Sequence, residues 1–307
     1  MIEVQELTKK YGELVAVRDL TFKVEPGRIW GLLGPNAAGK TTTMRILTGY
    51  LPATSGRASV AGFDVFDKPD DVKRSIGYLP EVLPLYQDMT VSAYLGFVAE
   101  IKQVPAAKRK AAVARVIESA GLKDVGRRLI KNISRGYKQR VGIAQAMIHD
   151  PKVLVLDEPT IGLDPAQIRE IRELIRGLRG EHTILLSTHI LPEVTQVCDG
   201  VVIINEGRLM ASGSLEDLAA SFEKRDGVIL KLRRAGAEEA AALRGLPGVE
   251  KVAVEGNELR VEWGRGRDLR DDVARLALDK GLGLREMRSV AGIEDLYMKI
   301  VSGGLEQ

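Results

Sequence analysis

One short stretch, Gly34-Pro35-Asn36-Ala37-Ala38-Gly39-Lys40-Thr41, fits the pattern G-x-x-x-x-G-K-T. The apolar run 29–33 precedes it and a helical pattern at 41–48 follows it, so it joins a buried strand to a helix. Main-chain N–H groups of such a loop wrap phosphate groups, and the positive end of the following helix adds to the attraction. The stretch therefore predicts an α/β unit that binds phosphate where a strand ends.

Lys40 brings a full positive charge to the β- and γ-phosphates of a nucleotide, and the Thr41 hydroxyl is expected to ligate Mg²⁺. A glycine-rich turn without a ligand is the alternative, and the Lys-Thr pair at the required offset argues against it. The loop residues predicted to contact the nucleotide are Gly34, Asn36, Ala37, Ala38, Gly39, Lys40, Thr41 and Thr42.

Short apolar runs alternate with amphipathic stretches through the first two thirds of the chain. The runs at 29–33, 153–156, 184–186 and 201–204 are typical of buried strands, with helical patterns between them. This order predicts an α/β fold around a largely parallel sheet. The segment 205–208 predicts a tight turn between two antiparallel edge strands, and Ser214 with Asp217 predicts a capping box that opens a short helix.

Two acids follow the apolar run 153–156 directly, which places Asp157 and Glu158 at the carboxyl edge of the sheet. We expect Asp157 to hold Mg²⁺ through water and Glu158 to orient or polarise the attacking water, since phosphoryl transfer needs mainly positioning and charge stabilisation. A third strand runs into His189, which suits a group that reaches the γ-phosphate. His149 and His182 are expected to be ordinary hydrogen-bonded residues.

From about residue 227 the pattern changes to strand, helix, two strands around a turn at 255–257, helix, strand and a last helix from Ile293. This order predicts a small α+β module of the ferredoxin-like βαββαβ type. We place the domain boundary between 222 and 227, which predicts a nucleotide-binding domain over 1–222 and an accessory domain over 227–307.

The formal charge of +3 is spread along the chain and does not argue for nucleic acid as a partner. The basic run 108–110 lacks interleaved aromatic residues and predicts a solvated helix face.

A single cysteine, Cys198, excludes an internal disulfide and is expected to be buried. The first residues lack a signal-peptide pattern, and no apolar run approaches the roughly 20 residues that cross a bilayer. Any membrane role is therefore expected to come through a partner.

With these elements in order, the sequence resembles the ABC (ATP-binding cassette) ATPase family. Tyr11, in Lys10-Tyr11-Gly12, matches the aromatic residue that stacks on adenine, with an ordinary surface or core tyrosine as the alternative. The segment 132–140, with Ser134 and Gly136, looks like the signature of the family, and Ile161-Gly162-Leu163-Asp164 looks like its D-loop. The resemblance covers nearly all of the first 215 residues.

The resemblance implies a P-loop NTPase cassette, in which a parallel sheet core carries an antiparallel β subdomain and a helical subdomain. It also implies an ATPase that uses ATP and Mg²⁺ to power a membrane transporter. The membrane-spanning permease would be a separate chain, and this chain would lie in the cytoplasm against the inner face of the membrane. The implied nucleotide contacts include Tyr11, Ser134, Gly136 and Asp164, and the implied metal contacts are Thr41, Glu81 and Asp157.

In the family, the signature binds the γ-phosphate that the opposite subunit holds. Ser134 stands where an N-cap would, so the following helix would direct its free N–H groups at an anion. We therefore expect two cassettes, most simply two copies of this chain, to meet head to tail around two ATP molecules. Pairing on ATP and separation after hydrolysis would supply the motion for transport.

Four residues depart from the pattern of the family. Ala37 replaces a glycine, which would strain the loop by about 1 kcal/mol if that position has positive φ, and this predicts reduced activity. Arg135 and Tyr137 replace a glycine and a glutamine in the signature, a variant that resembles the ABC-2 exporter subgroup. Glu81 stands where most members have the glutamine that links nucleotide to permease. The segment 81–103 is, by resemblance, the expected permease docking region.

Two other functions remain as alternatives. Soluble ABC ATPases of DNA repair or translation need a coiled-coil insertion or two tandem cassettes, and this sequence contains neither. A nucleotide-binding regulator that hydrolyses poorly is favoured by Ala37 and Glu81, and Glu158 and His189 argue against it. The sequence therefore favours a transport motor, with an export bias that comes from the subgroup.

Overall fold

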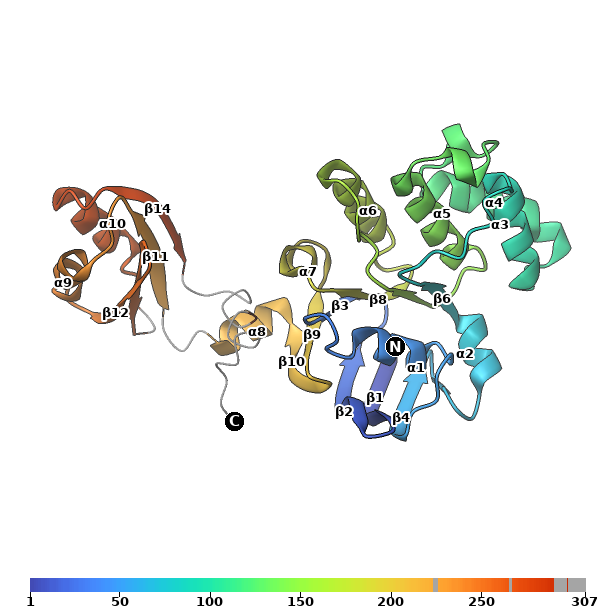
Figure 1. Ribbon diagram of the computed structural model, residues 1–307, viewed down its shortest axis with the longest axis horizontal. Coiled ribbons are helices and arrows are strands. Elements are labelled where there is room, and N and C mark those ends of the chain that lie inside the picture. The colour runs from blue at the N-terminus through green and yellow to red at the C-terminus, as the bar shows by residue number, and fades with distance from the viewer. Residues whose placement is uncertain (223–225, 265–266, 290–296, 298–307) are drawn as a thin grey trace. The chain divides into compact units, whose positions relative to one another are not determined.

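The computed structural model describes residues 1–222, 226–264, 267–289 and 297 (Figure 1). The chain divides into two compact units, Met1–Ser214 and Leu215–Gln307. Helix α8 (Leu215–Phe222) falls in the second unit, although the predicted boundary placed it in the first domain. The assignment of nucleotide binding to 1–222 and of an accessory role to 227–307 stays a prediction.

A mostly parallel sheet forms the centre of the first unit. Its strand order is β10-β9-β3-β8-β7-β6, and all neighbours except β10 and β9 are parallel. The strands are β3 (Ile29–Leu33), β6 (Ile76–Leu79), β7 (Val153–Leu156), β8 (Thr183–Thr188), β9 (Gly200–Asn205) and β10 (Arg208–Ser214). Every residue of β7 and β8 is buried, as expected for strands covered on both faces, and the strands predicted from apolar runs are confirmed.

The turn between β9 and β10 consists of Glu206 and Gly207, both with positive φ (48° and 76°). Two such residues suit the tight hairpin turn that the sequence predicted. The prediction that both strands lie at the edge was wrong for β9, which lies between β10 and β3. Because β9 continues the parallel sheet on its other side, its apolar run is buried rather than half-exposed.

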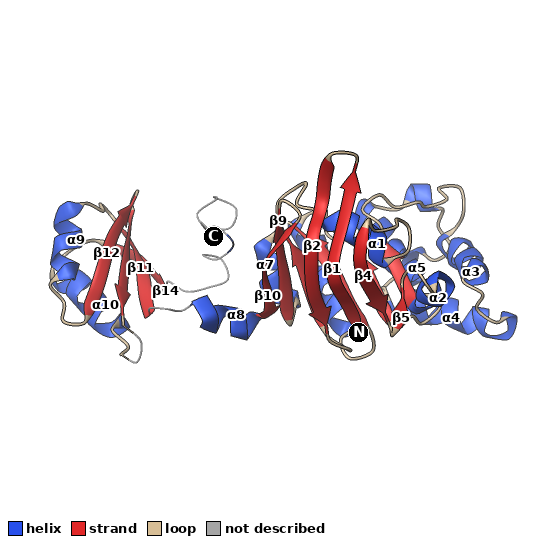
Figure 2. Ribbon diagram, turned by 90° about the horizontal axis from the view of Figure 1, so that it is seen from below, coloured by secondary structure: helices blue, strands red, loops and turns tan. Residues whose placement is uncertain are grey.

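A second, antiparallel sheet with the order β2-β1-β4-β5 completes the β-structure of this unit. Its strands are β1 (Ile2–Tyr11), β2 (Leu14–Val24), β4 (Ser55–Val60) and β5 (Phe63–Asp64). Helix α1 (Lys40–Leu47) lies between this sheet and the parallel one, and its Met44 and Leu47 join residues of both sheets in one core (Figures 1 and 2). The helix after the phosphate loop is thus held on both sides.

The remaining helices of the first unit cover the other face of the parallel sheet or gather beside it (Figure 1). Helices α3, α4 and α5 contact one another, which confirms the predicted helical subdomain. The helices are α2 (Pro69–Ser75), α3 (Val91–Ile101), α4 (Ala106–Ser119), α5 (Arg135–Met147), α6 (Pro165–Gly177) and α7 (Leu191–Val197), with short 3₁₀ turns at Lys123–Val125 and Ile130–Asn132.

The second unit forms an antiparallel sheet with the order β12-β13-β11-β14, covered by two helices. Its elements follow α8 as β11 (Asp226–Leu232), α9 (Ala237–Arg244), β12 (Val249–Glu255), β13 (Glu258–Trp263), α10 (Arg270–Asp279) and β14 (Leu284–Ser289). This is the βαββαβ order expected from the sequence. The predicted last helix from Ile293 lies outside the described residues.

Cys198 is buried and unpaired, as predicted, and burial raises the pKa of its thiol. Among the residues that the structure describes, no helix combines the length and apolar character needed to cross a membrane.

Candidate functional site

Loops from four neighbouring strands meet at the carboxyl edge of the parallel sheet. The loop 34–39 follows β3, Asp157 and Glu158 follow β7, His189 follows β8, and Glu81 lies two residues beyond β6. The order β3-β8-β7-β6 places these loops beside one another, so the residues that the sequence predicted for one site do come together.

These loops surround a cavity of about 670 Å³. Gly34 is absent from its lining, but Gly34 contributes its carbonyl to Lys40. The lining residues are Tyr11, Leu14, Ala16, Asn36, Ala37, Ala38, Gly39, Lys40, Thr41, Thr42, Glu81, Glu158, Ile161 and His189. The predicted phosphate, adenine and catalytic groups of a single chain therefore share one cavity.

The loop keeps its shape through glycines that no other residue can replace. A Cβ on Gly34 would lie 2.3 Å from the Ile204 carbonyl oxygen, and one on Gly39 would lie 2.6 Å from the Ala16 oxygen. Gly39 also has a φ of 102°, a conformation that L-residues rarely adopt. Ala37 has a φ of 65°, so the condition under which the sequence predicted strain is met.

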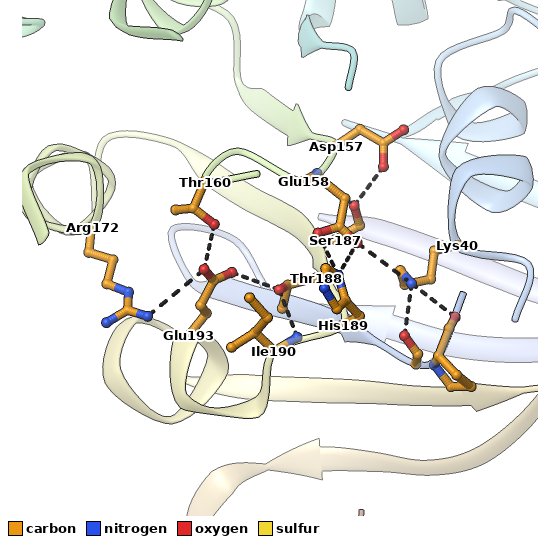
Figure 3. Close-up of polar contacts among 12 residues, drawn as sticks. Lys40, Asp157, Glu158, Thr160, Arg172, Ser187, Thr188, His189, Ile190 and Glu193 are labelled. Carbon is orange, nitrogen blue, oxygen red and sulfur yellow. Dashed lines mark hydrogen bonds and ion pairs between the residues drawn. The ribbon is translucent and has the colours of Figure 1, made fainter. Parts of the chain in front are cut away.

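Lys40 is buried, and its Nζ donates to the carbonyl oxygens of Gly34 (2.8 Å) and Pro35 (3.0 Å) (Figure 3). The same Nζ lies 3.6 Å from the Glu158 carboxylate. Burial lowers the pKa of Lys40, and the Glu158 carboxylate opposes that shift. The ammonium group is thus positioned at the mouth of the loop, where a phosphate chain would meet it.

Glu158 is the central acid of the site. Its side chain is 9% exposed, and the Nδ1 atom of His189 lies 3.1 Å from its Oε2. Burial raises the pKa of Glu158, and the contacts with His189 and Lys40 oppose the rise. A carboxyl group with a raised pKa accepts a proton more readily than an exposed one, which suits a general base.

The backbone of Glu158 has a φ of 46°, which is rare for a residue with a side chain. Ser187 holds this conformation, because its Oγ accepts a hydrogen bond from the Glu158 N–H (2.9 Å) and donates one to Asp157 Oδ1 (2.6 Å). Backbone strain of this kind is often found at functional sites. The role of Ser187 was missed at the sequence level, because a serine near the end of a strand carries no signal of its partners; here it is fully buried.

Tyr11 lies at the rim of the cavity, 45% exposed, and the Lys9 ammonium nitrogen is 5.2 Å from the centre of its ring. An exposed ring at the wall of a phosphate cavity is a suitable platform for a nucleotide base.

Thr41 and Glu81 line both this cavity and an adjoining one of about 620 Å³, which Asp157 also lines. Thr41 and Glu81 thus lie at the boundary between the two cavities, and Asp157 lies on the wall of the second one. Their hydroxyl and carboxylate oxygens are the ligand type that Mg²⁺ prefers.

Ser134, Gly136 and Asp164 of the signature and D-loop have structural roles but do not line the cavity, whereas Ile161 of the D-loop does. Ser134 is the N-cap of α5 and accepts from the Tyr137 N–H (3.3 Å), as predicted, while Asp164 is the N-cap of α6 and accepts from the Gln167 N–H (2.9 Å). A Cβ on Gly136 would lie 2.7 Å from the Gln167 side chain. These residues could contact a nucleotide only if it were bound to a second chain.

Arg135, one of the departures, joins these two segments. Its Nη2 donates to the Ile161 carbonyl oxygen at 3.1 Å, and its guanidinium occupies the space beside Gly162, where a Cβ would lie 2.3 Å from it. The arginine therefore connects the signature to the D-loop within one chain.

Comparison with known proteins agrees with this geometry. The family model described as "ABC transporter" matches residues 17–161. Bacitracin transport ATP-binding protein BcrA of Bacillus licheniformis is 35% identical over 99% of this chain and 98% of its own, and linearmycin resistance ATP-binding protein LnrL of Bacillus subtilis is 32% identical over 85% of each chain.

A solved structure described as the ATP-binding subunit of an ABC transporter superimposes with a TM-score of 0.66. It is 31% identical and covers 72% of this chain and 93% of its own. The chain therefore belongs to the ABC transporter family, as one of its ATP-binding subunits and ATPases.

Proposed function

We propose that the chain hydrolyses Mg-ATP with Glu158 as the base, Lys40 and the loop 34–42 as the phosphate cradle, and His189 as the residue that holds Glu158. The convergence of Lys40 and His189 on one buried carboxylate is the observation that carries this proposal. Glu158 would take a proton from the attacking water, and the main-chain N–H groups and Lys40 would stabilise the charge on the phosphates.

The metal contacts are proposed as Thr41 and Asp157, with Glu81 beside them. Mg²⁺ is commonly held by one or two carboxylates together with water and phosphate oxygens, so a site with few protein ligands suits it. When bound, Mg²⁺ would neutralise charge on the β- and γ-phosphates.

We propose that two copies pair head to tail, because Ser134, Gly136 and Asp164 lie at helix N-termini away from their own cavity. Helix N-termini attract anions, and a second chain would bring its γ-phosphate to them. Pairing would then require ATP, which is the property that couples hydrolysis to movement.

The segment 81–103 is proposed to dock a separate permease. Val82, Tyr86 and Ile101 are 82%, 53% and 59% exposed, and the ring centres of Tyr86 and Phe97 are 5.4 Å apart. Val82 lines the same cavity as Thr41, Glu81 and Asp157, so a partner that covers Val82 would lie beside the nucleotide site. Exposed apolar groups of this kind mark interaction surfaces. The chain would thereby lie on the cytoplasmic face of the membrane and drive export.

The test of hydrolysis and pairing is Glu158→Gln. The wild-type chain should hydrolyse Mg-ATP, while the variant should bind ATP, lose turnover by about 10³-fold or more and double in mass by light scattering with Mg-ATP. Lys40→Ala is the control that should lose both ATP binding and pairing. Turnover of the glutamine variant at the wild-type rate would reject the role of Glu158.

The docking proposal is tested by Val82→Glu and Tyr86→Glu, measured by co-purification with the membrane-spanning protein that the tagged wild-type chain retains from detergent-solubilised membranes. A charge in an apolar interface should abolish the complex while ATP binding persists. Lys110→Glu on α4 is a control that should not affect it. Retention of the complex by both segment variants would place the docking surface elsewhere.

A further inference from the structure

A buried carboxylate lies behind the catalytic groups. Glu193 on α7 is only 3% exposed and does not line the nucleotide cavity. Its Oε1 accepts a short hydrogen bond from the Thr160 hydroxyl, its Oε2 accepts from Thr188 Oγ1 at 2.6 Å, and an Arg172 nitrogen lies 3.9 Å from Oε1 (Figure 3). Both carboxylate oxygens are thus committed to neighbouring loops.

The two threonines belong to the loops that carry the reacting groups. Thr160 lies two residues after Glu158, and Thr188 directly precedes His189. Both hydroxyls are buried, and one carboxylate bridges them. His189 Nδ1 and Glu158 Oε2, which are 3.1 Å apart, therefore lie on two different loops, and Glu193 bonds to both of these loops.

The donors in this network can be arranged in one consistent way. An ionised carboxylate only accepts, so both threonine hydroxyls must donate to Glu193. Thr188 Oγ1 then accepts from the Ile190 N–H at 3.0 Å, which fixes the backbone on the far side of His189. His189 is held between Thr188, which donates to the Glu193 carboxylate, and Ile190, whose N–H donates to the Thr188 hydroxyl.

Burial of a carboxylate destabilises the folded state unless its oxygens accept hydrogen bonds. An apolar residue could anchor α7 to the sheet without this loss of free energy. The direction of these contacts, toward the loops of Glu158 and His189 rather than into the apolar core, points to a role at the site. We propose that Glu193 is a positioning residue for hydrolysis that sets His189 against Glu158. The proposal rests on the roles proposed above for those two residues.

The test compares three variants with one matched control. Thr160→Val and Thr188→Val each remove one arm of the network, and Glu193→Gln keeps the side-chain volume but leaves one acceptor oxygen. Thr183→Val is the control, because Thr183 is a buried threonine at the other end of β8 whose hydroxyl accepts from the Gly27 N–H at 3.1 Å. It loses a buried hydrogen bond on the same strand, away from the site.

Two readouts separate positioning from simple stability. In steady-state kinetics on the full chain, the three variants should lose kcat by about ten- to a hundredfold with KM for ATP unchanged, since small misplacements of catalytic groups have effects of this size. In NMR spectra, the His189 ring signals, identified by their loss in His189→Ala, should shift in all three variants. The chain has 3 histidines, so these signals can be resolved. Thr183→Val should change neither readout.

The proposal would be overturned if the three variants lost thermal stability but kept the wild-type kcat and unshifted His189 signals. Glu193 would then serve only to anchor α7 to the sheet. The His189 spectrum does not depend on turnover, so it tests the position of the ring whatever the role of Glu158. If Glu158→Gln hydrolyses ATP normally while the His189 signals shift in Glu193→Gln, the proposed function fails and the positioning contact remains.

Discussion

Two residues that line the nucleotide cavity have backbone conformations that side chains disfavour, Ala37 with a φ of 65° and Glu158 with a φ of 46°. Ser187 and the ion pair with Lys40 hold Glu158, whereas Ala37 has no polar side-chain group and is exposed. Left-handed alanine costs about 1 kcal/mol relative to a relaxed conformation. The strain at Ala37 is therefore a property that one substitution should remove.

We expect Ala37→Gly to stabilise the protein by about 0.5–1 kcal/mol, because glycine adopts positive φ without steric penalty. Relief of strain should also let the loop close more easily on phosphate and raise kcat/KM for ATP. Urea denaturation and steady-state kinetics measure the two effects.

Ala61→Gly is the matched control for this experiment. Ala61 has a φ of 54° in the turn between β4 and β5, away from the cavity. It should also relieve strain, but with a smaller gain in stability because the Ala61 methyl group packs against the core, and kcat/KM should not change. An Ala37→Gly variant that gains no stability, or an equal rise in kcat/KM for both variants, would contradict the link between loop strain and activity.

At the scale of elements, one histidine joins the end of α5 to β6. His149 Nε2 lies 3.1 Å from the Ile76 carbonyl oxygen, toward which Lys102 Nζ also points at 3.4 Å. Burial, followed by the charge of Lys102, lowers the pKa of His149 to about 4; the Ile76 carbonyl and Asp150 oppose the shift and Arg115 adds to it. The junction therefore holds a neutral imidazole.

This junction predicts an acid-sensitive stability. The unfolded chain binds a proton at His149 near pH 6.5 and the folded chain only near pH 4, so the free energy of unfolding should fall as pH falls between those values. His149→Gln does not titrate and should lack that part of the fall. Urea denaturation of both proteins at intervals from pH 7 to pH 4.5 measures it. If the free energy of unfolding fell equally with pH in the two proteins, protonation of His149 would not be what destabilises the folded chain in acid.

The sequence predicted β3, β7, β8, β9 and the hairpin partner β10, because a fully buried parallel strand leaves an uninterrupted apolar run such as Val153–Leu156. It did not predict β6 or the strands of the antiparallel sheet by position, because these strands leave no such run. It also predicted that Glu158 and His189 would lie at one edge of the sheet, since each follows such a strand. The place of β9 inside the sheet was not predictable, because strand order depends on contacts between distant segments. Glu193 and Thr160 were missed for the same reason: only their burial, which is a tertiary property, separates them from ordinary surface residues.

At the scale of the whole molecule, the described residues include a hydrophobic cluster in each of the two units. One is built from β1, β2, β4, α1 and the parallel sheet, and the other consists of residues between Val228 and Met287, including the buried Trp263. No residue belongs to both clusters. Each unit thus has a core of its own, which is the condition for independent folding.

Two cores predict two thermal transitions in calorimetry of the full chain, and only one of them should respond to nucleotide, since the cavity is lined entirely by residues of the first unit. At a hundredfold excess of Mg-ATP over its Kd, binding adds about 2.7 kcal/mol of stability, which should raise that transition by roughly 5–10 °C. Lys40→Ala should abolish the shift and leave the other transition in place. A single transition that moves as a whole with ATP would mean that the two units unfold together, and the second unit would then be energetically coupled to the nucleotide site.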